Sequence, residues 1–224
     1  MAEPKIIKNV ARDVDGNTYD GVEIGGMLWM ASNLRATRLD DGTPLRRYKT
    51  SEFGSLPYFE YPQGCENNQA KLAKFGLHYN FEAVDTELLS PNGWRVSTIA
   101  DWKELLAYLG KSDLFNLTDG EYRPYLAATA KSLCARDGWL KSDVENSIGC
   151  RVSENNGTGF GLYPNGRSLD VKAQAGCVSY LWCSDVYPVN NEYTWAVRAW
   201  HKDTHLVGTL VARAFGFGIR CVKC

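Results

Sequence analysis

The stretch from Asp13 to Leu34 reads DVDGNTYDGVEIGGMLWMASNL, which begins like a calcium loop and ends like a buried strand. An EF-hand loop needs glycine at position 6 and a bidentate glutamate at position 12. Counted from Asp13, Gly16 falls at position 4 and Glu23 at position 11, so both are misplaced. Asp15-Gly16-Asn17 and Gly25-Gly26 are instead typical of tight turns, because Gly and Asn tolerate positive φ. The stretch therefore predicts two small hairpins that lead into the core.

The composition is that of a globular protein that buries a hydrophobic core. The chain has 224 residues, of which 44% are hydrophobic, and its formal net charge is −1. This balance gives no electrostatic reason to expect a nucleic-acid partner. No apolar run approaches the roughly 20 residues that span a bilayer, and the opening MAEPKIIKNV lacks the apolar region of a signal peptide. We expect one domain over residues 1–224.

The cysteine count is odd, which leaves at least one thiol unpaired within the chain. A lone CxxC motif stands at Cys221-Val-Lys-Cys224, whereas a zinc site usually needs two such pairs. We therefore expect free or structural thiols, no metal and no cofactor. The seven cysteines are Cys65, Cys134, Cys150, Cys177, Cys183, Cys221 and Cys224.

Two helices are predicted among many short strands and turns. Thr98 to Leu109 has apolar residues at helical spacing, with Thr98 as N-cap and Asp101 three residues later. A second helix is predicted over Tyr125 to Cys134. The Pro-, Gly- and Tyr-rich stretch from Pro44 to Phe75 is interpreted as loop.

The last forty-five or so residues have the alternation of antiparallel strands. Strands are predicted at Ser179–Cys183, from Tyr193, and at Leu206–Ala212. From Tyr193 onward, Trp195, Val197 and Ala199 lie on one side of the strand, and Arg198 and Trp200 lie on the other. Strands packed on a helical layer give an α+β class.

Several blocks of the sequence resemble one family. The opening stretch is similar to the pattern DxDGNxYxxVxIGxxxWMAxNL of the Fibrobacter succinogenes major paralogous domain. The match continues, in the family's order, at Pro91–Thr98, Asn156–Phe160, Leu181–Ser184 and Gly216–Val222. These blocks span nearly the whole chain, so the resemblance is specific.

The resemblance implies a C-type-lectin-like fold of the formylglycine-generating-enzyme-related branch. Its N- and C-terminal strands are expected to pair, and two helices are expected to flank small antiparallel sheets. Members are mostly bacterial surface or secreted proteins without a defined activity. The family thus favours the cell surface, while the missing signal peptide and odd cysteine count favour cytoplasmic synthesis or a phage particle.

The chain departs from the family's pattern at three places. Ser90 stands where the family usually has Cys, which removes the disulfide partner that the resemblance implies for Cys221. Trp182-Cys183-Ser184-Asp185 replaces the WSST block, and the stretch from His205 to Phe215 replaces an Asn-rich segment.

The third departure suggests a diversified binding region. Lectin-fold proteins of this type are targets of diversity-generating retroelements, which most readily replace Asn codons. We expect residues 185–214 to be a variable surface of a recognition or adhesion protein that binds a protein or glycan ligand. Large polar and aromatic side chains give most contact energy at interfaces. The candidate ligand-binding residues, all expected to face solvent, are Tyr187, Asn190, Tyr193, Arg198, Trp200, His201, Asp203 and His205.

An enzyme is the alternative. A thiol- or metal-dependent oxidase of the formylglycine-generating type would use a reactive cysteine pair and copper, and Cys177 and Cys183 are the nearest pair in sequence. His201 and His205 are four residues apart, but they fall in a predicted strand and turn rather than on a helix. Calcium-dependent sugar binding would need carbonyl-loop motifs that are missing. We therefore expect no catalytic activity.

Several large residues are expected to have a structural role rather than a role in ligand binding. Trp29, Trp94, Trp102 and Trp182 sit among apolar neighbours and are expected in the core. Arg95 and Arg220 are expected to pair with acidic groups or backbone carbonyls near the joined termini.

Overall fold

The computed structural model describes residues 4–48, 56–110, 129–168 and 174–224. The strands are β1 (Ile6–Arg12), β2 (Thr18–Ile24), β3 (Met27–Met30), β4 (Arg46–Arg47), β5 (Tyr58–Glu60), β6 (His78–Tyr79), β7 (Trp94–Val96), β8 (Val178–Val186), β9 (Tyr193–Trp200), β10 (Val207–Ala212) and β11 (Cys221–Lys223). The helices are α1 (Gln69–Phe75), α2 (Phe81–Asp85), α3 (Ile99–Tyr108), α4 (Thr129–Leu133) and a 3-10 turn at Val152–Glu154. The first part of the helix predicted at Tyr125–Cys134 lies outside the described residues.

Three sheets organise the described residues. The largest has the order β1-β2-β3-β11-β7, and two smaller ones have the orders β10-β9-β8 and β4-β5-β6. Neighbouring strands within these sheets are antiparallel except β4 and β5, which are parallel. Few helices and several antiparallel sheets confirm the α+β class.

The opening stretch forms the two hairpins that its turns predict. The Asp13 carboxylate accepts hydrogen bonds from the backbone and side-chain amides of Asn17, both at 2.9 Å, and from the Tyr19 hydroxyl at 2.5 Å. Gly25 and Gly26 turn β2 into β3 with φ of 64° and 80°. Asp13 therefore braces the first turn with its own carboxylate.

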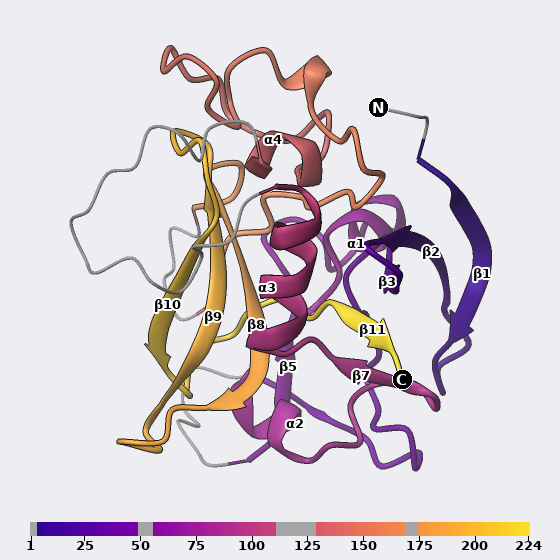
Figure 1. Cartoon of the computed structure of the whole chain (residues 1–224). Helices are drawn as coiled ribbons and strands as arrows, with labels where there is room; N and C mark the ends of the chain where they lie inside the picture. The colour runs from indigo at the N-terminus through magenta and orange to yellow at the C-terminus, as the bar shows by residue number, and fades with distance from the viewer. Residues whose placement is uncertain (1–3, 49–55, 111–128, 169–173) are drawn as a thin grey trace.

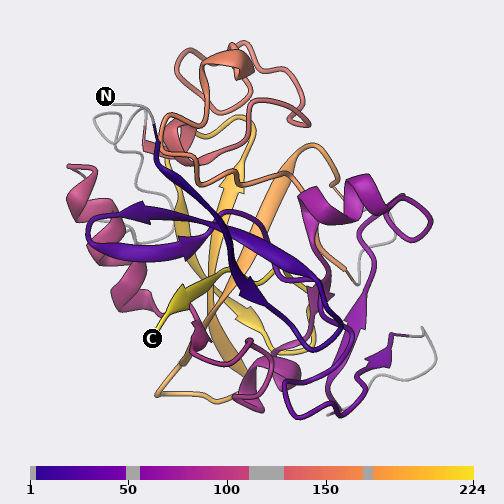
Figure 2. The same cartoon turned by 90° about the vertical axis from the view of Figure 1, so that its right-hand side faces the viewer.

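The two ends of the chain share one sheet without pairing directly. β11 lies between β3 and β7, with Val222 opposite both Trp29 and Arg95, while β1 is the outer edge strand. Figure 2 shows β1 and β2 in front with the short C-terminal strand beside them. The expected direct pairing of the terminal strands is wrong, because the two hairpins fold β3, not β1, toward the centre of the sheet.

Helix α3 begins where the capping pattern predicts. Thr98 Oγ1 accepts a hydrogen bond from the Asp101 amide at 3.1 Å, and Asp101 Oδ2 accepts one from the Thr98 amide at 2.6 Å. The buried face carries Trp102 and Leu105, both 0% exposed. In Figure 1, α3 stands between the β8–β9–β10 sheet and the five-stranded sheet, and its side chains belong to a core cluster with residues of both.

The tryptophans assigned to the core are buried. Trp29, Trp102 and Trp182 are 0% exposed, and Trp94 is 6% exposed. The rings of Trp29 and Trp102 lie 5.2 Å apart and each also contacts Phe160. This ring cluster joins α3 to the five-stranded sheet.

Arg95 and Arg220 have the structural roles predicted for them. Arg95 donates two hydrogen bonds to the Asp101 carboxylate, at 2.5 and 2.7 Å. Arg220 is fully buried and donates to the Asn33 side chain and to the carbonyls of Met30 and Phe160.

The stretch from Pro44 to Phe75 is not simply loop, so that prediction is wrong. It contains β4, β5 and α1, whose N-cap Asn68 accepts a hydrogen bond from the Lys71 amide at 2.9 Å. Phe59 of β5 pairs with Tyr79 of β6, twenty residues further along the chain. Elements this short show no periodicity, so only their distant partners reveal them.

Candidate ligand-binding surface

The eight candidate residues fall at the two ends of β9. Tyr187, Asn190 and Tyr193 belong to the β8–β9 hairpin, where β9 begins. The other five lie in the second half of β9 or in the turn that leads to β10. They are Arg198, Trp200, His201, Asp203 and His205. Seven residue steps separate Tyr193 from Trp200, which is roughly 23 Å along an extended strand. The structure therefore divides the predicted surface into a hairpin group and a turn group.

The hairpin group is held by its own backbone and side chains. The ring of Tyr187 contacts that of Trp195 edge to face, with centroids 6.1 Å apart. Asn190 Oδ1 accepts a hydrogen bond from the Glu192 amide at 2.9 Å, so the Asn190 side chain braces the turn. Tyr193 is 43% exposed.

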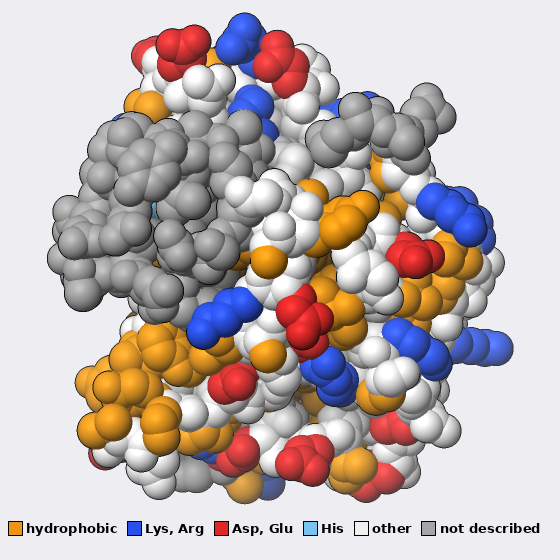
Figure 3. Space-filling model, viewed as in Figure 1, with side chains coloured by type: hydrophobic (Ala, Val, Ile, Leu, Met, Phe, Trp, Pro, Cys, Tyr) orange, Lys and Arg blue, Asp and Glu red, His pale blue; other side chains and the backbone are white. Residues whose placement is uncertain are grey.

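Strand β10 extends this group into a continuous apolar surface. Leu210 lies opposite Trp195 and Ala212 lies opposite Tyr193, so these four side chains share one face of the sheet. We call these four residues, with Tyr187, the hairpin surface. All are at least partly exposed, and Figure 3 shows hydrophobic side chains gathered over the lower ends of β9 and β10.

Trp195, Leu210 and Ala212 are members of this surface that the sequence reasoning missed. The alternation of the predicted strand placed Trp195 on the same side as Val197 and Ala199, which are buried. Only the register of β10 against β9 reveals that this face carries partly exposed side chains near the β8–β9 hairpin. The signal in the sequence was the spacing of Leu210 and Ala212, two residues apart.

The turn group is tied together by its own charges. Arg198 donates a hydrogen bond to Asp203 at 3.2 Å. Burial raises the pKa of Asp203, and Arg198 opposes that rise. Burial lowers the pKa of His205, and Asp203 opposes that fall. Trp200 is the most exposed residue of this group, with 38% of its surface accessible to solvent.

His201 is not a surface residue, so its expected exposure is wrong. It is 7% exposed, and its Nδ1 lies 3.3 Å from the carbonyl oxygen of Cys177. The loop before the 3-10 turn covers it, because the Gly149 amide donates to the His201 carbonyl at 2.7 Å. A side chain on Gly149 would collide with that same carbonyl.

Cys177 and Cys183, the two thiols that the oxidase alternative would use, lie apart along the chain. All seven cysteines are free. Cys177 precedes β8 and Cys183 lies six residues later within it, which is about 20 Å of extended chain. Burial also raises the pKa of Cys183 well above its ordinary value, which suppresses the reactive thiolate.

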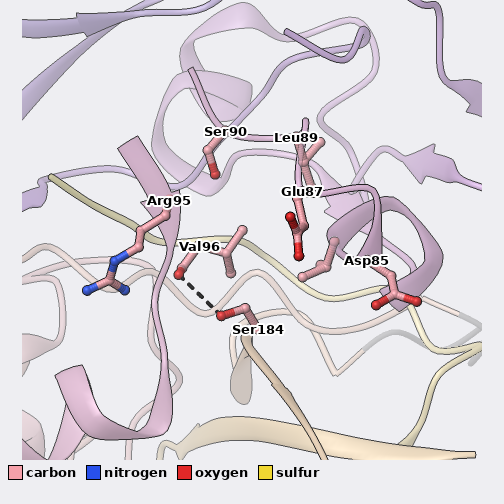
Figure 4. Close-up of a pocket in the computed structure, with 8 residues that line it drawn as sticks. Asp85, Glu87, Leu89, Ser90, Arg95, Val96 and Ser184 are labelled. Carbon is pink, nitrogen blue, oxygen red and sulfur yellow. Dashed lines mark hydrogen bonds between the residues drawn. The ribbon is translucent and has the colours of Figure 1, made fainter. Parts of the chain in front are cut away.

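A cavity of about 360 Å³ opens beside α2 and β7. Figure 4 shows the Asp85 and Glu87 carboxylates on one side, while the Arg95 guanidinium points away from them. Arg95 is occupied by Asp101, and Asp85 accepts a hydrogen bond from Arg213 at 2.6 Å. Neither histidine nor cysteine lines this cavity. Its lining residues are Val84, Asp85, Glu87, Leu89, Ser90, Arg95, Val96 and Ser184.

Two further findings concern metals and membranes. Across the described residues, no three His, Cys, Asp or Glu side chains gather so that they could hold a metal ion. Within the same part of the chain, no helix has the length and apolar character needed to cross a bilayer.

Comparison with known proteins identifies the family. The family model described as the Fibrobacter succinogenes major domain matches residues 22–223. The chain belongs to this family. No curated protein and no solved structure matches it.

One contact in this member of the Fibrobacter succinogenes major domain family involves a residue at which its sequence departs from the family pattern. Cys221 Sγ lies 3.6 Å from Ser90 Oγ, so the residue before the Pro-Asn-Gly-Trp motif does face Cys221. Burial raises the pKa of Cys221 to about 12. Ser90 thus leaves a buried, protonated thiol where the resemblance implies a disulfide.

Proposed function

We propose that this chain is a non-catalytic ligand-binding protein that recognises a protein partner through the hairpin surface, on a C-type-lectin-like scaffold. The observation that carries the proposal is the continuous apolar surface formed by Tyr187, Tyr193, Trp195, Leu210 and Ala212. Isolated exposed apolar side chains are ordinary, but contiguous ones mark interaction sites.

The chemistry of the surface favours protein over glycan. Tyr and Trp are the residues that most often dominate binding energy at protein interfaces. Leu210 and Ala212 add aliphatic area without polar groups, which suits an apolar patch of a partner. The first half of β9 is held from behind, because the side chains of Thr194 and Ala196, which alternate with Tyr193 and Trp195, are fully buried.

Diversification by a retroelement is part of the proposal. Residues 185–214 contain the hairpin surface and the turn group, while their inward positions are core. Codons for the solvent-facing positions could therefore change without loss of the fold. Comparison of the gene with an adjacent template repeat tests this: adenine-specific differences confined to this region are expected, and evenly scattered differences would contradict it.

The binding proposal is tested with two variants at opposite ends of one strand. A protein and glycan array of the full chain first supplies a ligand. Tyr193→Ala is then expected to weaken binding by roughly 30-fold or more, as interface hot spots do, with little change in Tm. Trp200→Ala is the matched control, because the two side chains are 43% and 38% exposed. It is expected to leave affinity unchanged.

Other results would contradict specific parts of the proposal. A loss of affinity in Trp200→Ala alone would move recognition to the turn group. A large fall in Tm for Tyr193→Ala would make that residue structural. Binding of glycans alone would overturn the choice of a protein partner.

The oxidase alternative stays a hypothesis with its own test. Stoichiometric copper in purified protein, bound through Cys177 and Cys183, would support it. The separation of these thiols along the chain gives it no structural support, and we expect seven thiols in a titration of the metal-free, denatured chain.

A further inference from the structure

The tip of the β8–β9 hairpin carries apolar side chains that the hairpin surface does not include. We call residues 185–193, which read DVYPVNNEY, the tip segment. Val189 is 80% exposed and Val186 is 40% exposed. Figure 1 shows this hairpin at the lower left, where it reaches past the end of its sheet. Exposed aliphatic side chains that adjoin an apolar surface enlarge the area that a partner can cover.

The apolar side chains of the tip lie on both faces of the hairpin. Val186 is the cross-strand partner of Thr194, so the two side chains share one face. The core of the protein covers Thr194 completely but leaves Val186 partly exposed. Tyr193, the neighbour of Thr194 in β9, points to the opposite face, which is that of the hairpin surface. A partner with a flat surface could contact only one of these two faces.

Backbone hydrogen bonds hold the tip in one conformation. The Tyr193 amide donates to the Asn190 carbonyl at 3.2 Å, and the Tyr187 amide donates to the Tyr193 carbonyl at 3.4 Å. The Arg213 amide donates to the Glu192 carbonyl at 3.2 Å, which fixes the tip to the end of β10. A segment that is already ordered loses less conformational entropy when it binds. The tip therefore has the shape of a preformed projection.

The charged side chains of the tip segment are all negative. It contains two carboxylates, Asp185 and Glu192, and neither Lys nor Arg. Arg213 follows β10 nearby, but its side chain is paired with Glu82 and Asp85 of α2. Complementary charges favour association and suppress wrong partners. The charge of the tip therefore favours a partner that presents Lys or Arg to it.

The polar side chains of the tip favour a protein cleft over a lipid bilayer. Asn190, Asn191 and Glu192 directly follow Val189 and are exposed. Insertion of Val189 into a bilayer would carry these polar groups toward hydrocarbon, which offers them no hydrogen bonds. Anionic headgroups would also repel the carboxylates of the tip. A protein cleft, in contrast, combines apolar walls with a few placed polar groups.

We propose that the tip of the β8–β9 hairpin inserts into an apolar cleft of the protein partner, and that Lys or Arg residues line the rim of this cleft. This inference rests on the proposed function, because it assigns a shape and a charge to the partner that the hairpin surface recognises. Val189 fills the floor of the cleft, while Val186 and Tyr193 contact its opposite walls. Glu192 pairs with the basic rim.

Alanine variants of the full chain test the insertion. The probe is the purified protein that binds the chain on the array, and its affinity is measured for each variant. Val189→Ala and Val186→Ala are each expected to weaken binding by about tenfold, because each loses aliphatic area that the cleft buries. Val144→Ala is the matched control, since Val144 is 45% exposed and follows α4 at the opposite end of the molecule in Figure 1. It should leave the affinity unchanged.

The pattern of losses separates this inference from the proposed function. If Tyr193→Ala weakens binding while Val186→Ala and Val189→Ala do not, the partner docks flat on the hairpin surface. The inference is then overturned and the proposed function stands. If none of the three variants weakens binding, both are overturned. An array on which no protein binds has the same consequence.

The charge of the cleft rim is tested by salt. Glu192→Gln should weaken binding of the same protein severalfold at low salt, and the difference should disappear at about 1 M salt, where charges are screened within about 3 Å. Glu145→Gln, which changes an exposed carboxylate beside Val144, is the control and should have no effect. Tighter binding by Glu192→Gln would overturn the basic rim.

Vesicles test the choice of a protein cleft over a membrane. The full chain is mixed with vesicles of phosphatidylcholine, with and without phosphatidylserine, and sedimented. We expect the protein to stay in the supernatant with both kinds of vesicle. Sedimentation with either kind that Val189→Ala abolishes would overturn the inference in favour of a lipid surface.

Discussion

Single buried residues fix distant segments of this chain to one another. Arg220 has no carboxylate partner among its hydrogen bonds, which all go to neutral oxygen atoms. Its guanidinium also lies over the Phe160 ring, 4.2 Å from the centroid. Burial lowers its pKa to about 9. The planar guanidinium carries five N–H donors in a fixed geometry, so one side chain satisfies several neutral oxygen atoms at once.

Ser90→Cys is expected to create a disulfide with Cys221. The two side-chain heteroatoms lie 3.6 Å apart, so a modest side-chain adjustment brings two sulfurs into bonding distance. Closing so long a loop typically stabilises a protein by about 2–4 kcal/mol. The variant carries one cysteine more than the seven of the wild type, so thiol titration should count eight thiols after reduction and two fewer after oxidation. The oxidised variant should also have a higher Tm, which reductant reverses.

The matched control is Ser90→Cys combined with Cys221→Ser. It should gain no reductant-sensitive stability. If oxidation does not lower the thiol count of the single variant, the two positions do not approach each other in solution.

His78 is expected to make stability depend on pH. Its pKa in the folded chain is lowered to about 3, against about 6.5 in the unfolded chain. Below pH 6.5 the unfolded state therefore binds a proton that the folded state excludes, and the free energy of unfolding falls as pH falls. Lowering the pH from 7 to 5 therefore reduces the free energy of unfolding by about 2 kcal/mol.

Denaturant unfolding at pH 7 and pH 5 measures this effect. Over that pH interval, the free energy of unfolding of His78→Gln should fall by about 2 kcal/mol less than that of the wild type, since glutamine has no proton to gain. Equal losses in the two proteins would show that His78 is protonated or exposed in the folded state.

At the scale of elements, α3 depends on its N-terminal capping box. Thr98 and Asp101 satisfy each other's backbone amides, and Asp101 also accepts from Arg95 of β7. The helix is thereby joined to the five-stranded sheet at its first turn.

Thr98→Ala is expected to lower the free energy of unfolding by about 1 kcal/mol, the usual cost of losing an N-cap oxygen. Thr98→Ser keeps that oxygen and should lose far less. Thermal or denaturant unfolding of the two variants measures the difference. A Ser variant as unstable as the Ala variant would assign the effect to the lost methyl group instead.

At the scale of the whole molecule, the position of β9 decides which candidate residues can act together. Its middle is covered on both faces, because Ala196, Val197 and Ala199 are buried in two core clusters. Only its ends reach solvent. A ligand large enough to contact both ends would have to span roughly 23 Å, so the hairpin surface is the more compact site.

The cores and turns followed from local sequence patterns. Thr98 with Asp101 predicted α3, the Asp15-Gly16-Asn17 turn predicted the first hairpin, and four tryptophans were assigned to the core. These features depend on periodicity, capping and turn chemistry, which act over a few residues. The same patterns could not locate β4, β5 or α1, whose partners are far along the chain.

Local patterns were enough to assign the α+β class, the family and the α3 helix, because motifs, capping and hydrophobic periodicity act over a few residues. Three features emerge only from the fold: His201 is covered, Leu210 and Ala212 complete the surface of Tyr193 and Trp195, and Ser90 faces Cys221. Each of these depends on strand register or loop packing. Both are set by contacts between residues distant in sequence, which no local pattern encodes.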